Sequence, residues 1–417
     1  GPTKQLTCSK EEVQEATEEF FIEWMQKKAK AWGPKEEREK GIFRDRPKAH
    51  EKIHELAEVS DQIEEILKRG TNADENGERL RGLHQEIADE ITLEELKEYL
   101  RAAKKGTAPG VSGVPIEMWW HAPEEALKEL VSIMNTVMES GRIPEVWEHR
   151  VIRPLAKTET AVGLNDIRPI TLLEVSQKIL TGIITKRIAT VWNSNDLLNQ
   201  TQMAFLNGRG CYQAIERTRT IMLDSARRGK ECHALFLDLA KAYDSVEYWA
   251  MEDAMRGMGI PKKIVDLMGA IDSKAKAQIL MGKGEKTSWI PLGRGAPQGE
   301  VMSPLRFIVW MNLLLEVIGS TGVGYKAQGV EKPYPGHAFC DDGWFIAEST
   351  EELQKTCNIV SAFCEIFKVK INAGKSHYMV SGSGKRGGAR EIRLWDHTSN
   401  GGKGAWQTVT EGEDAVR

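Results

Sequence analysis

The stretch Gly336-His-Ala-Phe-Cys-Asp-Asp-Gly-Trp-Phe-Ile346 sets two adjacent aspartates, Asp341 and Asp342, between apolar residues. Earlier in the chain a third aspartate, Asp238, ends the apolar run Ala234-Leu-Phe-Leu237. A carboxylate in an apolar strand pattern is costly to bury unless a cation compensates its charge. The pattern therefore predicts that the three carboxylates converge on shared cations at the ends of neighbouring strands.

Divalent magnesium is the cation that suits such a set. Mg²⁺ prefers oxygen ligands, keeps several waters, and is usually held by one or two carboxylates together with substrate phosphates. Two such ions ~3.5–4 Å apart serve in-line phosphoryl transfer in nucleic-acid polymerases. We therefore expect Asp238, Asp341 and Asp342 to bind two Mg²⁺ ions, with Mn²⁺ as a substitute, and to be catalytic.

The bulk composition is that of a globular protein. The chain has 417 residues, of which 41% are hydrophobic and 28% charged, so two or three domains are expected. We find no apolar run long enough for a membrane span and no apolar signal segment at the N-terminus. The cysteines at positions 8, 211, 232, 340, 357 and 364 form no CxxC pair or zinc spacing, which favours free thiols in a reducing compartment.

The net charge of −4 is unevenly distributed. Residues 1–100 hold 25 acidic and 17 basic residues, a balance of −8, so the remainder holds 36 acidic and 40 basic residues, a balance of +4. The acidic total therefore does not exclude a basic groove for nucleic acid.

Hydrophobic periodicity predicts alternating helices and strands, an α+β class. We expect a loop at residues 71–82 and a helix from 92 to 105 with Thr92 as its N-cap. Asp244 is expected to cap a helix that begins at 244 or 245. The other expected helices cover residues 11–30, 48–69, 123–140, 172–191, 305–318 and 349–367, and the expected strands cover 151–156, 231–238 and 369–371.

Several residues near these acids suit nucleotide binding. Tyr243, five residues after Asp238, offers a flat ring that packs against a sugar and leaves no room for a 2′-hydroxyl. Gln298 offers a donor and an acceptor, and Gly299 lets backbone approach a ligand. The plain alternatives are half-buried packing for the tyrosine and an ordinary loop for the other two.

Three basic residues suit phosphate chemistry. Lys157 and Arg168 flank a turn and could grip a triphosphate, the arginine as a fork and the lysine as a point charge. Lys375, in a turn after Asn372, could protonate the departing pyrophosphate. Each also fits an ordinary solvated surface position.

The ordered set of motifs resembles the reverse-transcriptase palm, and its details resemble a non-LTR (LINE-type) retrotransposon enzyme. The set comprises Phe236-Leu-Asp-Leu-Ala-Lys-Ala-Tyr-Asp-Ser-Val246, Ala296-Pro-Gln-Gly299, Phe339-Cys-Asp-Asp342 and Gly374-Lys375. The details are Ile167-Arg-Pro-Ile-Thr-Leu-Leu173 and Gln202 to Phe205 followed by Gly208-Arg-Gly210.

The resemblance implies an RNA-directed DNA polymerase with a right-hand fold. It assigns residues 1–90 to a helical N-terminal extension, 91–230 to fingers, 231–385 to the palm, and 386–417 to the end of the palm before a missing thumb. It implies an RNA template, a DNA or RNA primer, dNTPs and the rest of a larger polyprotein as partners, no membrane, and an intracellular place in nucleus and cytoplasm. The implied substrate contacts are Lys157, Arg168, Leu239, Ala240, Tyr243, Gln298 and Gly299, and the implied proton donor is Lys375.

Two alternatives stay open at this point. An RNA-dependent RNA polymerase would need a polar group near Tyr243 to accept the ribose 2′-hydroxyl. A polymerase-like RNA-binding scaffold with little activity is the other, although three uncompensated carboxylates would destabilise an inert fold.

Overall fold

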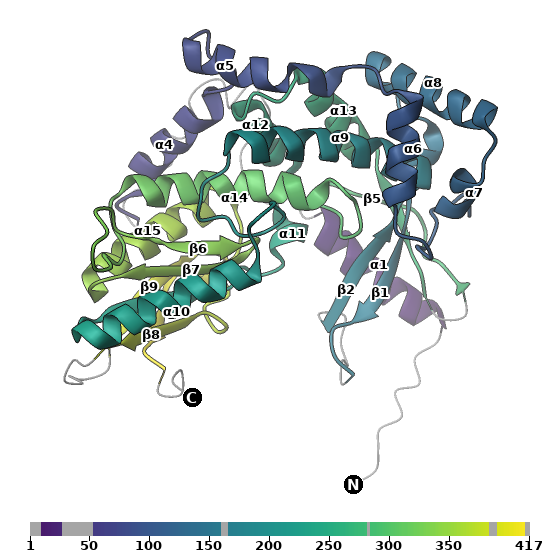
Figure 1. Ribbon diagram of the computed structural model, residues 1–417. Coiled ribbons are helices and arrows are strands. Elements are labelled where there is room, and N and C mark those ends of the chain that lie inside the picture. The colour runs from purple at the N-terminus through teal and green to yellow at the C-terminus, as the bar shows by residue number, and fades with distance from the viewer. Residues whose placement is uncertain (1–9, 27–52, 160–165, 282–283, 383–389, 413–417) are drawn as a thin grey trace. The chain divides into compact units, whose positions relative to one another are not determined.

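Helices and strands alternate along the chain in the computed structural model, which describes residues 10–26, 53–159, 166–281, 284–382 and 390–412 (Figure 1). The expected α+β class is confirmed. The described residues fall into two units, each drawn from separate stretches. Unit 1 comprises the described parts of Gly1–Lys28, Gln85–Arg187 and Pro261–Ser303, and unit 2 those of Ala29–His84, Ile188–Ile260 and Pro304–Arg417.

Unit 1 is built around a four-stranded sheet in the order β2-β1-β4-β5. β1 pairs antiparallel with β2, with Leu155 opposite Arg168, and parallel with β4. The parallel partner β4 lies more than a hundred residues after β1 in the sequence, so the sheet forms only when these distant segments pair. The strands are β1 (His149–Ala156), β2 (Ile167–Leu172), β4 (Lys276–Ile279) and β5 (Ile290–Pro291).

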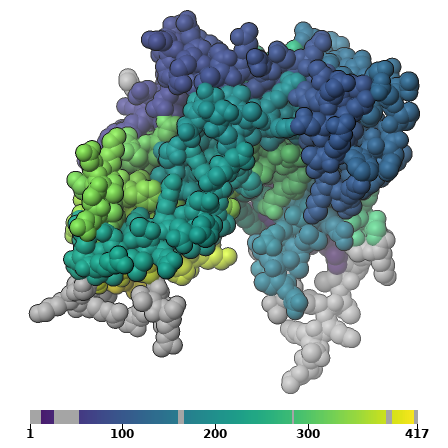
Figure 2. Space-filling view, viewed as in Figure 1, coloured from purple at the N-terminus to yellow at the C-terminus, as the bar shows by residue number. Residues whose placement is uncertain are grey.

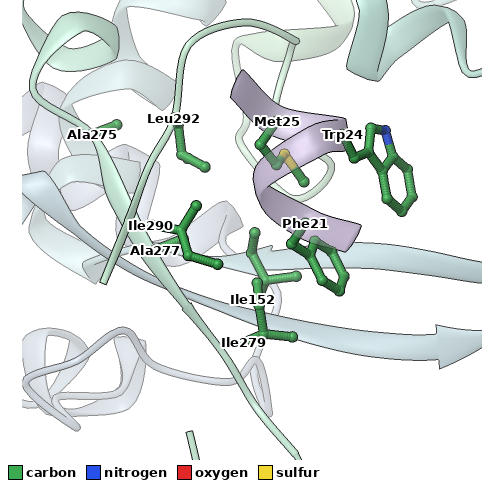
Figure 3. Close-up of a cluster of buried hydrophobic side chains, with 9 residues drawn as sticks. All are labelled: Phe21, Trp24, Met25, Ile152, Ala275, Ala277, Ile279, Ile290 and Leu292. Atoms are coloured by element: carbon green, nitrogen blue, oxygen red, sulfur yellow. The ribbon is translucent and has the colours of Figure 1, made fainter. Parts of the chain in front are cut away.

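The N-terminal helix α1 (Lys10–Gln26) packs on this sheet (Figure 3). Its backbone is also tied to the loop after β5, where Gly293 N donates to Met25 O at 3.1 Å. Burial of this face from water stabilises both the helix and the sheet. The apolar cluster consists of Phe21, Trp24, Met25, Ile152, Ala275, Ala277, Ile279, Ile290 and Leu292.

The other helices of unit 1 follow the sequence signals closely. Thr92 Oγ1 accepts a hydrogen bond from Glu95 N at 3.2 Å, so the predicted N-cap is confirmed. Gly141 ends its helix at φ 66°, a backbone that glycine adopts without strain. The helices are α6 (Leu93–Ala102), α7 (Ile116–Trp120), α8 (Glu124–Ser140) and α13 (Lys262–Ser273); α9 (Val175–Asn195) runs from unit 1 into unit 2.

Unit 2 contains a four-stranded antiparallel sheet in the order β6-β7-β3-β8. Helix α10 (Cys211–Arg228) lies in front of this sheet and α15 (Thr350–Phe367) behind it (Figure 1). The atoms of α10 form part of the outer surface of the unit (Figure 2). The strands are β3 (Cys232–Leu237), β6 (Gly336–Phe339), β7 (Asp342–Ala347) and β8 (His377–Ser381).

The rest of unit 2 supports this sheet. A hairpin of β9 (Glu391–Asp396) and β10 (Ala405–Thr410), which the sequence did not predict, packs against α15, with Trp395 N donating to Ser361 Oγ at 2.9 Å. The remaining helices are α4 (Leu56–Lys68), α5 (Glu75–His84), α11 (Ala242–Ser245), α12 (Tyr248–Gly257), the buried α14 (Ser303–Ser320) and the short α16 (Ser399–Gly402).

Three local predictions were wrong. The loop expected at 71–82 contains α5, because Asp74 Oδ1 accepts from Gly77 N at 2.7 Å and starts a helix there. Asp244 lies inside α11, and the N-cap positions of α11 and α12 are Lys241 and Glu247 instead. The strand expected at 369–371 is only an isolated bridge between Ile371 and Leu239, while the strand β8 follows it.

The two units are each drawn from separate stretches of chain, whereas the domain ranges expected from the sequence are contiguous; the assignment of those ranges to extension, fingers and palm stays a prediction. Residues 188–230 belong to unit 2, where α10 packs on the sheet. Residues 261–303 belong to unit 1, because β4 pairs with β1. None of the described helices is long and apolar enough to cross a membrane.

Candidate active site

The three predicted carboxylates lie at one end of the sheet of unit 2. Asp238 follows the last residue of β3, and Asp341 and Asp342 stand where β6 turns into β7. The antiparallel register pairs Leu237 with Gly343, so the next pair in that register joins Asp238 and Asp342. The sheet itself therefore brings together acids that are far apart in sequence.

Electrostatic interactions link the three groups. Burial, together with the charges of Asp342 and Asp238, raises the pKa of the Asp341 carboxyl to about 6. The pKa of Asp342 is also raised, first by burial and then by Asp238. Among the residues that the structure describes, none forms an ion pair with any of the three carboxylates.

This arrangement suits a hard divalent cation. All donors are carboxylate oxygens, which Mg²⁺ prefers, and their mutual repulsion is what a bound cation would relieve. Within the described ranges no three His, Cys, Asp or Glu side chains stand ready to hold a metal ion by themselves. The ligand roles of the three aspartates therefore stay a prediction.

Asn372 holds Asp238 in place and was not assigned a role from the sequence. Its Nδ2 donates to Asp238 Oδ2 at 2.7 Å, and its backbone N donates to Asp238 O at 2.9 Å. The buried Ser376 Oγ accepts from Asp238 N at 3.2 Å and donates to Asn372 O at 3.0 Å. The position of the asparagine just before the Gly374-Lys375 turn was the only signal available in the sequence.

Tyr243 lies beside the acidic turn. Its ring stacks on buried Phe307, with centroids 4.3 Å apart and planes 9° apart. Its hydroxyl and Cys340 Sγ form a hydrogen bond of 2.7 Å. Burial, with Cys340 and the negative charge of Asp341, raises the pKa of the phenol. The ring orientation is therefore fixed from two sides, as a sugar-contacting surface requires.

Other predicted residues of unit 2 surround the same strand end. Leu239 is buried and pairs with Ile371, and Ala240 N donates to Lys370 O at 2.8 Å. Lys375 is exposed in the turn that Asn372 starts. Its role as a proton donor stays a prediction.

In unit 1 the basic residues share one face of the β1–β2 hairpin. Cross-strand partners point to the same side of a sheet, and so do residues two apart along a strand. Arg168 lies opposite Leu155, and Lys157 is two residues beyond Leu155. Arg153, opposite Ile170, adds a third exposed cation to this face. The alternation Arg153, Leu155, Lys157 was visible in the sequence, but Arg153 was not assigned a role.

The loop that carries Gln298 closes on the same hairpin. Gln298 O accepts from Thr171 N of β2 at 2.7 Å. Gly299 has φ +117°, and a Cβ there would lie 2.5 Å from Thr171 O, so this close approach requires glycine. That these unit 1 side chains and the carboxylates of unit 2 serve one nucleotide stays a prediction.

A family model described as "Reverse transcriptase (RNA-dependent DNA polymerase)" matches residues 156–401, which include all three aspartates. The chain belongs to the reverse transcriptase family. The resemblance to LINE-type enzymes that the motifs indicated is confirmed by the relatives of this reverse transcriptase.

Two relatives illustrate this. The chain is 27% identical to the Pol polyprotein from the type-2 retrotransposable element R2DM of Drosophila melanogaster, over 66% of this chain and 25% of that protein. It is 23% identical to the RNA-directed DNA polymerase from mobile element jockey of Drosophila melanogaster, over 68% of this chain and 31% of that protein. The chain thus spans about a quarter to a third of these relatives.

One solved structure is also similar. Apo telomerase from Candida Tropicalis, truncated from the C-terminal domain, aligns over 64% of this chain and 57% of that chain, with a TM-score of 0.43 and 12% identity. This likeness is too low to bear on the fold.

Proposed function

We propose that the chain is the polymerase part of a larger protein and that it copies an RNA template into DNA. The observation that carries this proposal is the meeting of Asp238, Asp341 and Asp342 at one end of the unit 2 sheet, where burial and the neighbouring carboxylates raise the pKa of Asp341 and of Asp342. In this proposal unit 2 is the palm and unit 1 contributes the fingers.

The aspartates would hold two Mg²⁺ ions. When bound, magnesium activates the primer 3′-hydroxyl and neutralises charge on the triphosphate and the departing pyrophosphate. The chain's own part is positioning. Asn372 fixes the Asp238 carboxylate by its 2.7 Å hydrogen bond, and the β6–β7 turn places Asp341 and Asp342 at the same end of the sheet as Asp238.

The remaining residues would select and orient the nucleotide. The exposed Arg168 and Lys157 supply charge for a triphosphate. The ring of Tyr243, held by Phe307 and Cys340, would exclude a ribose 2′-hydroxyl. Lys375 would return a proton to pyrophosphate. The template, the primer, an intracellular location and the remainder of a polyprotein belong to the same proposal.

The test is primer extension with Asp341→Asn on a primed RNA template with Mg²⁺ and dNTPs. We expect a loss of about a thousandfold or more in rate, because the charge that holds the metal is removed. Asp61→Asn, at an exposed site on α4, is the matched control and should extend normally. Near-normal extension by Asp341→Asn would overturn the proposal.

Two further measurements separate the alternatives. A scaffold would bind RNA whether or not Asp341 is substituted, and neither the unmodified protein nor the variant would extend a primer. An RNA polymerase would prefer rNTPs in the unmodified protein. Tyr243→Ala should instead relax a preference for dNTPs that the unmodified protein displays.

A further inference from the structure

The turn that carries Asp341 has an unusual backbone. Phe339 pairs with Asp342, so Cys340 and Asp341 are the two central residues of a two-residue hairpin loop. Cys340 has φ 62°, whereas Asp341 has no positive φ. A positive φ at the first central position alone defines a type II′ turn, which prefers glycine there. A cysteine stays in this conformation only where its surroundings impose it.

Gln202 supplies that constraint. Its side chain is fully buried. Its Oε1 accepts hydrogen bonds from Cys340 N at 3.2 Å and from Ala204 N at 3.0 Å. Because both contacts use the amide oxygen, the orientation of the amide is determined.

The backbone around Gln202 is fixed to the same hairpin. Ala338 N donates to Thr201 O at 3.0 Å, and Met203 N donates to Ala338 O at 2.8 Å. The segment therefore adds to the edge of β6 in parallel, next to the turn. The amide reaches Cys340 from a neighbour that cannot shift independently of β6.

We infer that Gln202 is a positioning residue for DNA synthesis, which holds the Cys340 turn so that Asp341 and Asp342 face Asp238. The inference rests on the proposed roles of these aspartates. Without the amide, the Cys340 N–H would be buried with its acceptor removed, and the turn would be free to relax. A displacement of about 1 Å in a reacting group costs on the order of a hundredfold in rate.

The first test is Gln202→Leu, which keeps the approximate size but removes the acceptor. We expect kcat for single-nucleotide addition to fall by about ten- to a hundredfold, with KM for the dNTP within about threefold. The matched control is Gln200→Leu, since Gln200 is exposed and its Nε2 donates to the exposed Asp196 Oδ1 at 3.1 Å. The control should keep both constants.

The second test uses Cys340→Gly, because glycine adopts a positive φ with no outside support. Gln202→Leu is measured in the unmodified background and in the C340G background. We expect its cost in kcat to shrink to less than about threefold in the second background. A role in packing alone would give the same cost in both. If Gln202→Leu alone does not fold, recovery of folding and activity in the double variant carries the same meaning.

Two outcomes would overturn the inference: a Gln202→Leu variant with unchanged kcat, or an equal loss in both backgrounds. Neither outcome touches the proposed function, which fails only if Asp341→Asn extends normally. An inactive D341N variant beside a fully active Q202L variant would therefore reject this inference alone.

Discussion

The two hairpins that carry charged site residues are built in opposite ways. The β6–β7 hairpin has a tight turn with a positive-φ cysteine, and its carboxylates repel one another. The β1–β2 hairpin displays Arg153, Lys157 and Arg168 on an exposed face. Carboxylates that bind one metal ion repel one another, so the fold must hold them close together. Exposed basic side chains that bind a large anion do not need such exact placement. We therefore expect kcat to depend on the first hairpin and KM on the second.

The largest effect should come from Asp238→Asn. We expect kcat to fall about a thousandfold or more, because one of the charges proposed to hold the metal is lost. Single-turnover extension on a primed RNA template measures this, with unfolding temperature as the check on folding. If Asp238→Asn raised only KM for the dNTP and left kcat unchanged, the expected difference between the two hairpins would be contradicted.

Arg168→Ala should act mainly on nucleotide binding. We expect KM for dNTP to rise about ten- to a hundredfold, since a charge-assisted contact to phosphate is worth about 1.5–3 kcal/mol. Arg153→Ala is the informative companion, because Arg153 lies on the same face of the hairpin. Steady-state kinetics over a dNTP series give both constants. A large fall in kcat with unchanged KM would contradict the assignment.

Asn372→Leu tests whether the orientation of the Asp238 carboxylate affects kcat. We expect kcat to fall about tenfold, because a hydrogen bond to a charged group is lost and Asp238 is no longer oriented. Asn76→Leu, exposed on α5, is the control. Equal losses in the two variants, or a change confined to KM, would rule out the positioning role.

The smallest expected effect is on the free energy of unfolding of the Asp341→Asn variant, measured without divalent ions. Because the folded pKa of Asp341 is raised to about 6 from 3.8, the folded state binds the proton more tightly. The destabilising charge is therefore fully present above pH 6, shrinks as the pH falls, and disappears below about pH 4. Asp341→Asn should stabilise the metal-free protein at pH 7 by on the order of 1 kcal/mol.

Urea unfolding at pH 7 and pH 4 measures this difference. The gain should be much smaller at pH 4, where the folded-state carboxyl of Asp341 is protonated and the unfolded-state carboxyl, with its ordinary pKa of 3.8, is only partly ionised. Added Mg²⁺ should reverse it at pH 7, because only the unmodified protein gains from binding. A variant less stable than the unmodified protein at pH 7 without metal would show that repulsion is not the dominant interaction.

The sequence was most informative where a local pattern carried a strong energetic penalty. Acids in apolar runs predicted that Asp238, Asp341 and Asp342 meet at one end of a sheet, as the strand register shows. Cap and breaker residues predicted α6 and α8. It failed where side chains bond to distant backbone. Gln202 reaches Cys340 across 138 positions, and no periodicity reveals such a contact.

The composition of the two units from separate stretches of chain could not be predicted from the sequence either. The pairing of β1 with β4 and the packing of α10 on the sheet depend on segments distant in the chain. Local propensity is silent about such pairings. The α5 helix was missed because its start depends on the Asp74 side chain, in a stretch whose composition favours a loop.

The docking of α1 bears on how a shortened protein can be made. The family match begins at residue 156, yet Phe21, Trp24 and Met25 fill the apolar side of the β1–β4–β5 strands. A fragment trimmed to the matched region would lose β1 and present bare Ala277, Ile279 and Ile290 to solvent. Such a fragment should aggregate during expression, whereas a fragment that keeps both residues 10–26 and β1 should stay dispersed.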